Sequence, residues 1–179
     1  MAMALVSRRR HEHVWYLCMV MSKINAFIFA TTGAFLFGAA TVQAAEPKIV
    51  TLTQIGCQFL ESENGVDHGF KPKSADDCNA INEKTGADRL AKAKKIELKP
   101  GKYILRVTNK NVPYALGFWI RSEGFNTYNP LDRLKKVNVS GGGLTLGKSR
   151  DYEVDLKPGK YTYSCPLNPT PNYTIVVKG

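Results

Sequence analysis

Hydrophobic and polar positions alternate in short runs along most of the chain after residue 47. The clearest run, DYEVDL at 151–156, places Tyr152, Val154 and Leu156 on one side and charged residues on the other. A period of two is typical of a strand with one buried face. Similar strand-like runs occupy 48–55, 95–99, 102–109, 115–121, 151–156, 160–165 and 173–178. The pattern predicts an all-β chain folded as an antiparallel Greek-key β-sandwich.

Turn signals separate these runs. The sequence LKPGKY occurs at 98–103 and again at 156–161, each time between two strand-like runs. Proline fixes φ at the second position of a turn and glycine accepts a positive φ at the third, so both copies suit a type II turn. We expect each copy to close a hairpin. The glycine run at 141–143 is expected to be a loop. It is not expected to bind phosphate, since no helix pattern follows it.

An insertion at 56–94 interrupts the strand pattern after the first strand. Its stretch from Ser74 to Asp77 resembles a capping box, and the residues that follow continue a helical pattern that Gly86 can end. The sequence therefore predicts a short helix, or two, packed across the sandwich.

The N-terminal part has the pattern of an export signal. Residues 24–45 carry no charge, and Val42-Gln43-Ala44 offers small residues for cleavage after Ala44. Because the segment before the uncharged run is long, translation is expected to start at Met19 or Met21. The arginine pair at 8–9 leaves a twin-arginine signal as an alternative, and an uncleaved run is long enough to be a membrane anchor. The prediction is a signal peptide at 1–44 and a single periplasmic or secreted domain at 45–179.

The chain is basic, with a formal net charge of +10 over 179 residues. Residues 1–44 hold four basic residues and one acidic residue, so the predicted domain keeps 21 basic against 14 acidic residues, a net charge of +7. Basic residues cluster only at 92–95 and 133–136. Such a surface can steer docking onto an acidic protein or an anionic membrane. No motif of interleaved aromatic and basic residues points to nucleic acid.

Two stretches resemble the cupredoxin family, the fold of plastocyanin and azurin. They are VTNKNVPYALGFWI at 107–120 and the ending at 156–179, in which KYTYSC stops at Cys165 before a proline-rich loop. The resemblance implies a sandwich with a type 1 copper site made of one cysteine, two histidines and usually a methionine. Cys165 stands at the cysteine position, Tyr114 at the first histidine and Asn168 at the second, and no methionine follows.

A count of residues supports the loss of that site. After cleavage the chain keeps His68 as its one histidine and has no methionine, since the other histidines and all four methionines lie at or before residue 21. An ordinary type 1 centre needs a thiolate and two imidazoles. One copy of the chain is therefore expected to lack a self-sufficient type 1 copper site.

The cysteines of the predicted domain leave three interpretations open. In the first, Cys57 and Cys78 form a disulfide, as an exported protein allows, and Cys165 is a buried core residue. In the second, Cys57, Cys78, Cys165 and His68 gather around a soft ion such as Cu(I). In the third, Cys165 joins Tyr114, Asn168 or His68, or a partner's ligands, in an unusual copper centre.

No arrangement of residues suggests an enzyme, because one histidine without a placed serine offers no triad. The sequence predicts an exported cupredoxin-like protein associated with copper handling or electron transfer. The alternative is a metal-free interaction or assembly module that docks through the end near Tyr114 and Cys165. A protein partner is expected, with a redox or copper-handling protein as one candidate. Contact with a membrane is expected only through an uncleaved N-terminal segment.

Overall fold

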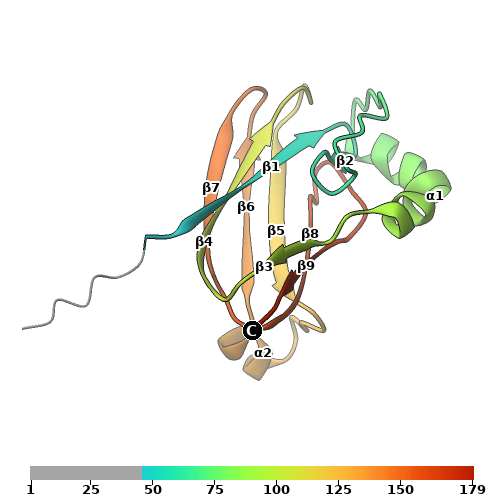
Figure 1. The fold of residues 1–179 in the computed structure, drawn as a ribbon. Coiled ribbons are helices and arrows are strands. Elements are labelled where there is room, and N and C mark those ends of the chain that lie inside the picture. Colours follow the sequence, from blue (N-terminus) through green and yellow to red (C-terminus); the bar gives the residue numbers. More distant parts are fainter. Residues whose placement is uncertain (1–45) are drawn as a thin grey trace, which may run out of the picture. The chain divides into compact units, whose positions relative to one another are not determined.

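The computed structural model describes residues 46–179 and forms a sandwich of two β-sheets (Figure 1). The strands are β1 (Lys48–Ile55), β2 (Gln58–Phe59), β3 (Ile96–Leu98), β4 (Gly101–Asn109), β5 (Leu116–Ser122), β6 (Asn138–Leu144), β7 (Ser149–Leu156), β8 (Gly159–Ser164) and β9 (Tyr173–Val177). The helices are α1 (Ala75–Lys92) and α2 (Pro130–Lys135).

The predicted all-β sandwich with a helical insertion is confirmed, whereas the predicted signal peptide and its cleavage after Ala44 lie outside the described residues. No helix within 46–179 is both long and apolar enough to cross a bilayer.

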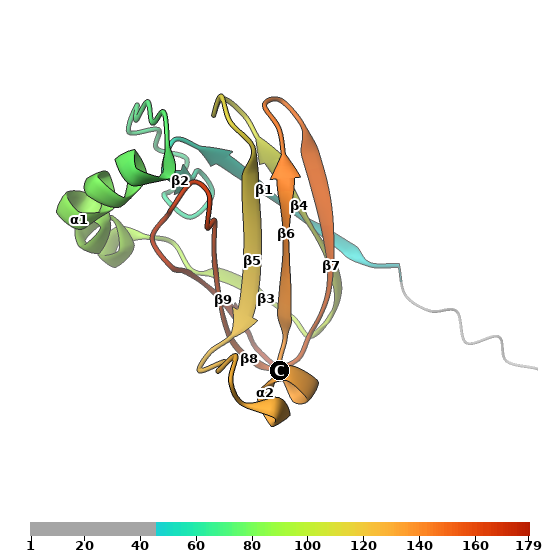
Figure 2. The same cartoon turned by 180° about the vertical axis from the view of Figure 1, so that it is seen from behind.

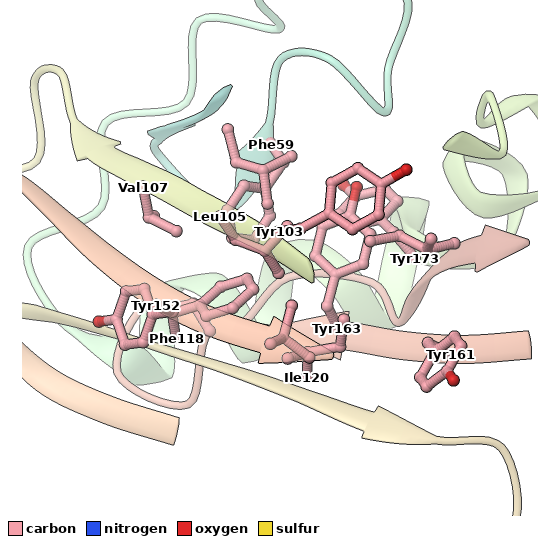
Figure 3. Close-up of a cluster of buried hydrophobic side chains, with 14 of the residues drawn as sticks. Phe59, Tyr103, Leu105, Val107, Phe118, Ile120, Tyr152, Tyr161, Tyr163 and Tyr173 are labelled. Carbon is pink, nitrogen blue, oxygen red and sulfur yellow. The ribbon is translucent and has the colours of Figure 1, made fainter. Parts of the chain in front are cut away.

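Side chains from one face of each strand fill the space between the sheets. The alternating residues of β7, Tyr152, Val154 and Leu156, are all buried. Aromatic rings from both sheets meet at the centre, where Phe59 lies edge-on to Tyr163 with ring centroids 5.3 Å apart (Figure 3). Edge-to-face packing of this kind adds to the burial of apolar area. The core therefore joins the insertion, through Phe59, to the C-terminal strands.

Strand pairing differs from the prediction in one respect. The sheets have the orders β2-β1-β4-β7 and β3-β9-β8-β5-β6, and β1 pairs with β4, and β3 with β9, in parallel. The prediction of antiparallel pairing throughout was therefore wrong for these two pairs. Parallel neighbours need long connections, and the insertion at 56–94 supplies one between β1 and the next long strand.

The two LKPGKY turns do not close hairpins. Each joins strands of different sheets, β3 to β4 in the first copy and β7 to β8 in the second. The glycines do have positive φ, 146° at Gly101 and 149° at Gly159, as the turn chemistry required. In both copies the final tyrosine donates a hydrogen bond to the carbonyl of the lysine four residues before it, at 2.8 Å for Tyr103 to Lys99 and for Tyr161 to Lys157. The repeated sequence therefore forms a repeated corner between sheets.

The second corner gives a testable prediction. Replacing Tyr161 with Phe removes the bond to the Lys157 carbonyl and the acceptor of the Lys157 N–H, which lies 3.0 Å away. Lys157 is exposed, so water replaces both bonds, and we expect a loss of about 1 kcal/mol in the free energy of unfolding. Urea denaturation measures it. The matched control is Tyr128→Phe, whose side chain is 94% exposed and should show no change. Equal midpoints for the two variants would contradict a stabilising corner.

The glycine run at 141–143 lies in β6, so its assignment as a loop was wrong (Figure 2). A Cβ at Gly141 would lie 3.0 Å from Cε1 of Tyr152, which belongs to β7. The strand thus uses a glycine where an aromatic ring of the next strand passes close to its backbone. Sequence propensity alone disfavours glycine in strands, which is why the pattern did not indicate β6.

Helix α1 begins where the sequence predicted and ends later. The Ser74 side chain accepts from the Asp77 N–H, and Asp77 accepts from the Ser74 N–H at 3.1 Å, which forms the expected capping box. The helix continues through Gly86 to Lys92, so Gly86 does not end it. Arg89, in the last turns, is anchored in the interior, and this tertiary contact outweighs the weak helix propensity of glycine.

Candidate functional site

The loops that follow β4, β6 and β8 meet at one end of the sandwich, away from α2 (Figure 1). Asn109, which is fully buried, organises this end. Its side-chain N–H group donates to the carbonyls of Val112, at 3.0 Å, and Leu144, at 3.3 Å. Its backbone N–H donates to the Lys148 carbonyl at 3.0 Å. The end that carries Tyr114 and Cys165 is therefore held by hydrogen bonds between its own loops.

Cys165 directly follows β8 and is 1% exposed. Its sulfur accepts a hydrogen bond from the backbone N–H of Asn168 at 3.2 Å, and the backbone N–H groups of Gly117 and Leu167 also act to lower the pKa of the thiol. Burial raises the pKa of the thiol, and these three N–H groups oppose that shift only in part. Cys165 is thus a free, buried thiol whose protonated form is favoured, with donors in place that would stabilise its thiolate.

Asn168 is fully buried and connects the C-terminal loop to the end of β1. Its Nδ2 donates to the Ile55 carbonyl and its Oδ1 accepts from the Cys57 N–H, both at 2.9 Å. These two bonds bridge more than 110 positions of sequence. The amide therefore acts as a clamp between the two segments, with both of its ends in use.

Tyr114 lies beside this clamp. Its hydroxyl is 3.2 Å from the Ser74 carbonyl and 3.5 Å from Oδ1 of Asn168. Burial is the main cause that raises the pKa of Tyr114. The phenol therefore stays protonated and donates to the cap of α1. The structure thus brings together three of the sequence-predicted site residues, Cys165, Asn168 and Tyr114.

Cys57 and Cys78 form a disulfide, as the first interpretation of the cysteines predicted. The bond ties the start of the insertion to the first turns of α1. The Sγ of Cys78 lies 3.1 Å from Oδ1 of Asn168, so the disulfide adjoins the clamp. A four-residue Cu(I) cluster with Cys165 and His68 is contradicted, because the disulfide occupies both of the other sulfurs.

The thiol arrangement predicts a clear titration. In the native, non-reduced protein, Cys165 should react with a thiol reagent only very slowly, because it is buried and its pKa is raised. After denaturation without reductant, we expect one thiol per chain in the domain at 45–179, and three after reduction. Peptide mass after alkylation counts them and assigns each to its cysteine. Fast labelling of Cys165 in the native protein, or three thiols in this domain before reduction, would contradict this arrangement.

His68 takes part in a different cluster. Its Nε2 lies 2.6 Å from Oε2 of Glu63, a carboxylate that is 5% exposed, and its ring stacks on Phe70. Arg89 Nη2 binds Oε1 of the same carboxylate at 2.6 Å, and the Tyr173 hydroxyl donates to it as well. Burial, followed by this bond to Glu63, raises the pKa of Tyr173. His68 is therefore a partner of Glu63 and not a neighbour of Cys165.

A pocket of about 330 Å³ opens beside this cluster, between α1 and the segment at 63–70. The charged atoms of Glu63 and Arg89 are already used within the cluster. Of the charged residues that line the pocket, Lys84, Asp88 and Lys92 are therefore left for a ligand. Sequence reasoning missed Glu63 and Arg89, since they are 26 positions apart and nothing in the spacing of a polar insertion marks two residues as buried.

Within residues 46–179, no group of three or more His, Cys, Asp or Glu side chains is placed to hold a metal ion. Near Cys165 the further candidate donors are the Asn168 amide and the Tyr114 hydroxyl, and protein groups already bind both. The residues present do not fit a type 1 copper centre, which requires two imidazoles beside the thiolate.

Comparison with known proteins found similarity at the level of structure. No protein-family model matches the chain, and no curated protein sequence matches it significantly. Among solved structures, the chain is similar to auracyanin B, with 14% sequence identity and a TM-score of 0.44, over 77% of this chain and 94% of the other.

Proposed function

We propose that this chain is an exported cupredoxin-type protein that docks a protein partner through the end carrying Tyr114 and Cys165. It does so without a self-sufficient type 1 copper site and without enzymatic activity. The observation that carries the proposal is the clamp made by Asn168. At the position where the resemblance places a copper ligand, the amide holds the end of β1 through Ile55 and Cys57.

The neighbouring groups support the same conclusion. Tyr114, at the other histidine position, donates its hydroxyl to the cap of α1. Cys165 keeps its proton at neutral pH because burial raises the pKa of its thiol. A copper site would need the thiolate and two free ligands. The hydrogen bonds of Asn168 and Tyr114 therefore hold this end of the sandwich in one arrangement and leave neither side chain free for copper.

The surface itself suits a protein partner. Its loops expose Leu146 and Leu167, which are 52% and 45% accessible, and the exposed Pro166 lies next to Leu167. Exposed lysines, Lys110 and Lys148, lie at the edge of the same loops. An apolar centre with a charged rim is typical of docking sites. A partner with an apolar patch and acidic residues around it would complement this surface.

Site-specific photocrosslinking tests the docking proposal. A crosslinking amino acid at Leu167, in the exporting cell, should give one discrete adduct that Leu146→Glu abolishes. The matched control is the same amino acid at Ile49, on β1, which is 52% exposed and should give no such adduct. Adducts of equal yield at both positions, or none at Leu167, would refute docking through this end.

A second candidate function is the carriage of Cu(I) by Cys165. Its support is the hydrogen bond from the Asn168 N–H to the sulfur, at 3.2 Å, because this donor would stabilise a thiolate once copper displaced the proton. A lone thiolate favours the soft cuprous ion over Cu(II). The raised pKa of the thiol opposes this function, which is why docking is preferred.

Addition of copper separates the two candidates. We expect Cu(II) to produce no intense blue charge-transfer band, because Tyr114 and Asn168 offer no imidazole to form a trigonal field. The visible spectrum and the copper content after gel filtration measure the outcome. One retained Cu(I) per chain, lost in Cys165→Ser, would favour copper carriage. A stable blue monomer that loses its colour in Cys165→Ser would refute the absence of a type 1 centre.

A further inference from the structure

Helix α2 lies at the end of the sandwich opposite the loops that follow β4, β6 and β8 (Figures 1 and 2), and large apolar side chains in and just before it are exposed. Tyr128 is 94% exposed, Leu131 59% and Leu134 83%. They are three positions apart along the chain, so in α2 the two leucines share one face. Within residues 46–179 nothing covers them. Such a concentration of exposed apolar area in so short a segment marks an interaction surface.

The segment holds these side chains outward because its polar side is fixed to the domain. Asp132 is buried and accepts from the Asn126 N–H at 2.8 Å and from Lys136 Nζ at 2.9 Å. Lys136 also donates to the Gly124 carbonyl at 2.9 Å. Asn129 caps the helix through the Leu131 N–H at 3.0 Å. With a polar face turned inward, the apolar face of α2 is left to the outside.

The charge around this surface is positive. Between 121 and 136 the chain has four basic and two acidic residues, a net charge of +2. One acidic residue, Asp132, is paired with Lys136, and the other, Glu123, faces Lys160 at 3.8 Å. Arg133 and Lys135 are exposed and form no such pair with any residue of 46–179, and they flank the exposed Leu134 in α2. Among the described residues, the surface therefore combines apolar side chains with unpaired cations.

We propose that this α2 surface, consisting of Tyr128, Leu131 and Leu134 with Arg133 and Lys135, binds an anionic membrane surface. Leucine and an aromatic residue on one side with basic residues beside them is the pattern of segments that lie in the lipid interface. The leucines enter the headgroup boundary while the long basic side chains reach anionic headgroups. A lipid surface fits better than an acidic protein, because the three side chains are large and apolar and each is more than half exposed.

This binding would orient the domain. The α2 surface and the docking end lie at opposite ends of the strands (Figure 1), so membrane contact leaves the Cys165 end facing away from the bilayer. Residues 24–45, the uncharged run, precede β1 in sequence. Contact through α2 is distinct from anchoring by that run.

Tryptophan fluorescence tests the proposal on the full chain. Tyr128→Trp places a reporter on the surface, and the chain without that change gives the background from Trp15 and Trp119. Vesicles of brominated phosphatidylcholine and phosphatidylglycerol should quench the emission of this reporter, and high salt should reduce the quenching by screening. Adding Leu131→Gln with Leu134→Gln should lower the inserted population more than about tenfold, since two leucines lose their burial. The matched control, Leu146→Gln with Leu167→Gln, removes two exposed leucines from the opposite end and should change nothing.

If something other than a lipid surface covers the α2 surface, the Tyr128→Trp reporter should give a different fluorescence signal. Quenching that is absent, or equal in vesicles of phosphatidylcholine alone, would overturn the proposal. A blue-shifted reporter emission without vesicles would assign the surface to a second copy if the shift depended on protein concentration, and to residues 1–45 if it did not. A shift on addition of polyglutamate, without quenching by anionic vesicles, would assign the surface to an acidic protein.

Discussion

Replacing Glu63 with Gln should lower the free energy of unfolding by about 3–5 kcal/mol, because it leaves a buried guanidinium without its counter-charge. Glu63 and Arg89 are 5% and 7% exposed, and Arg89 Nε lies 3.1 Å from both carboxylate oxygens. Glutamine keeps the size of the side chain and can accept only through one oxygen. The substitution therefore removes the negative charge and keeps the packing of the side chain.

The same cluster ties three parts of the chain together, which is why its loss should destabilise the whole domain. Arg89 comes from α1 and also donates to the Cys57 carbonyl at 2.8 Å, beside the disulfide. Tyr173 comes from β9 and His68 from the loop before α1. Without the carboxylate, α1 loses the link that runs from Arg89 through Glu63 to Tyr173 in β9.

Urea unfolding, followed by far-ultraviolet circular dichroism, measures the effect. The matched control is Asp151→Asn, which neutralises a carboxylate paired with Arg106 at 2.8 Å on the surface, where both side chains are more than 40% exposed. Exposed pairs of this kind contribute little, so its unfolding midpoint should stay close to that of the parent. Equal midpoints for Glu63→Gln and Asp151→Asn would show that the buried cluster does not stabilise the fold.

Alternation and turn chemistry were sufficient to predict the sandwich. DYEVDL and KYILRVTN became β7 and β4 with the expected faces buried, and the capping box at Ser74 began α1. The disulfide between Cys57 and Cys78 was also predicted, as one of three open interpretations. These features depend on local periodicity or on a small number of cysteines, which a sequence shows directly.

Features that depend on contacts between distant segments could not be predicted. β6 was missed because its glycines make room for Tyr152, and this reason exists only once β7 lies beside it. The buried pair of Glu63 and Arg89 looked like two ordinary charges in a polar insertion. The LKPGKY turns had the expected glycine conformation, and only the positions of their strands decided that they cross between sheets.

The candidate site shows the same division. Sequence resemblance identified Cys165, Asn168 and Tyr114 as a group, and they do lie together. It could not indicate that Asn168 binds the end of β1, because Ile55 lies 113 positions earlier in the chain. The role of position 168 therefore changes from a possible ligand to a structural clamp.

Replacing Asn168 with Ala should accordingly lower the free energy of unfolding by about 2–5 kcal/mol. Two buried backbone groups, the Ile55 carbonyl and the Cys57 N–H, would lose their partners, at about 1–3 kcal/mol for each unsatisfied group. A cavity beside the disulfide adds to the cost. Chemical denaturation of the oxidised protein measures the change, with Asn172→Ala, an exposed asparagine of the same loop, as the matched control that should remain close to the parent.

Asn168→Asp refines the test, because an aspartate keeps the acceptor for the Cys57 N–H and loses the donor to the Ile55 carbonyl. In this variant a carboxyl oxygen at position 168 would face the Ile55 carbonyl oxygen in a buried place. The free energy of unfolding of the variant should therefore fall well below that of the parent. If Asn168→Ala instead matched Asn172→Ala, the two hydrogen bonds would contribute nothing to the fold. The main argument that position 168 is a clamp, and hence unavailable to copper, would then fail.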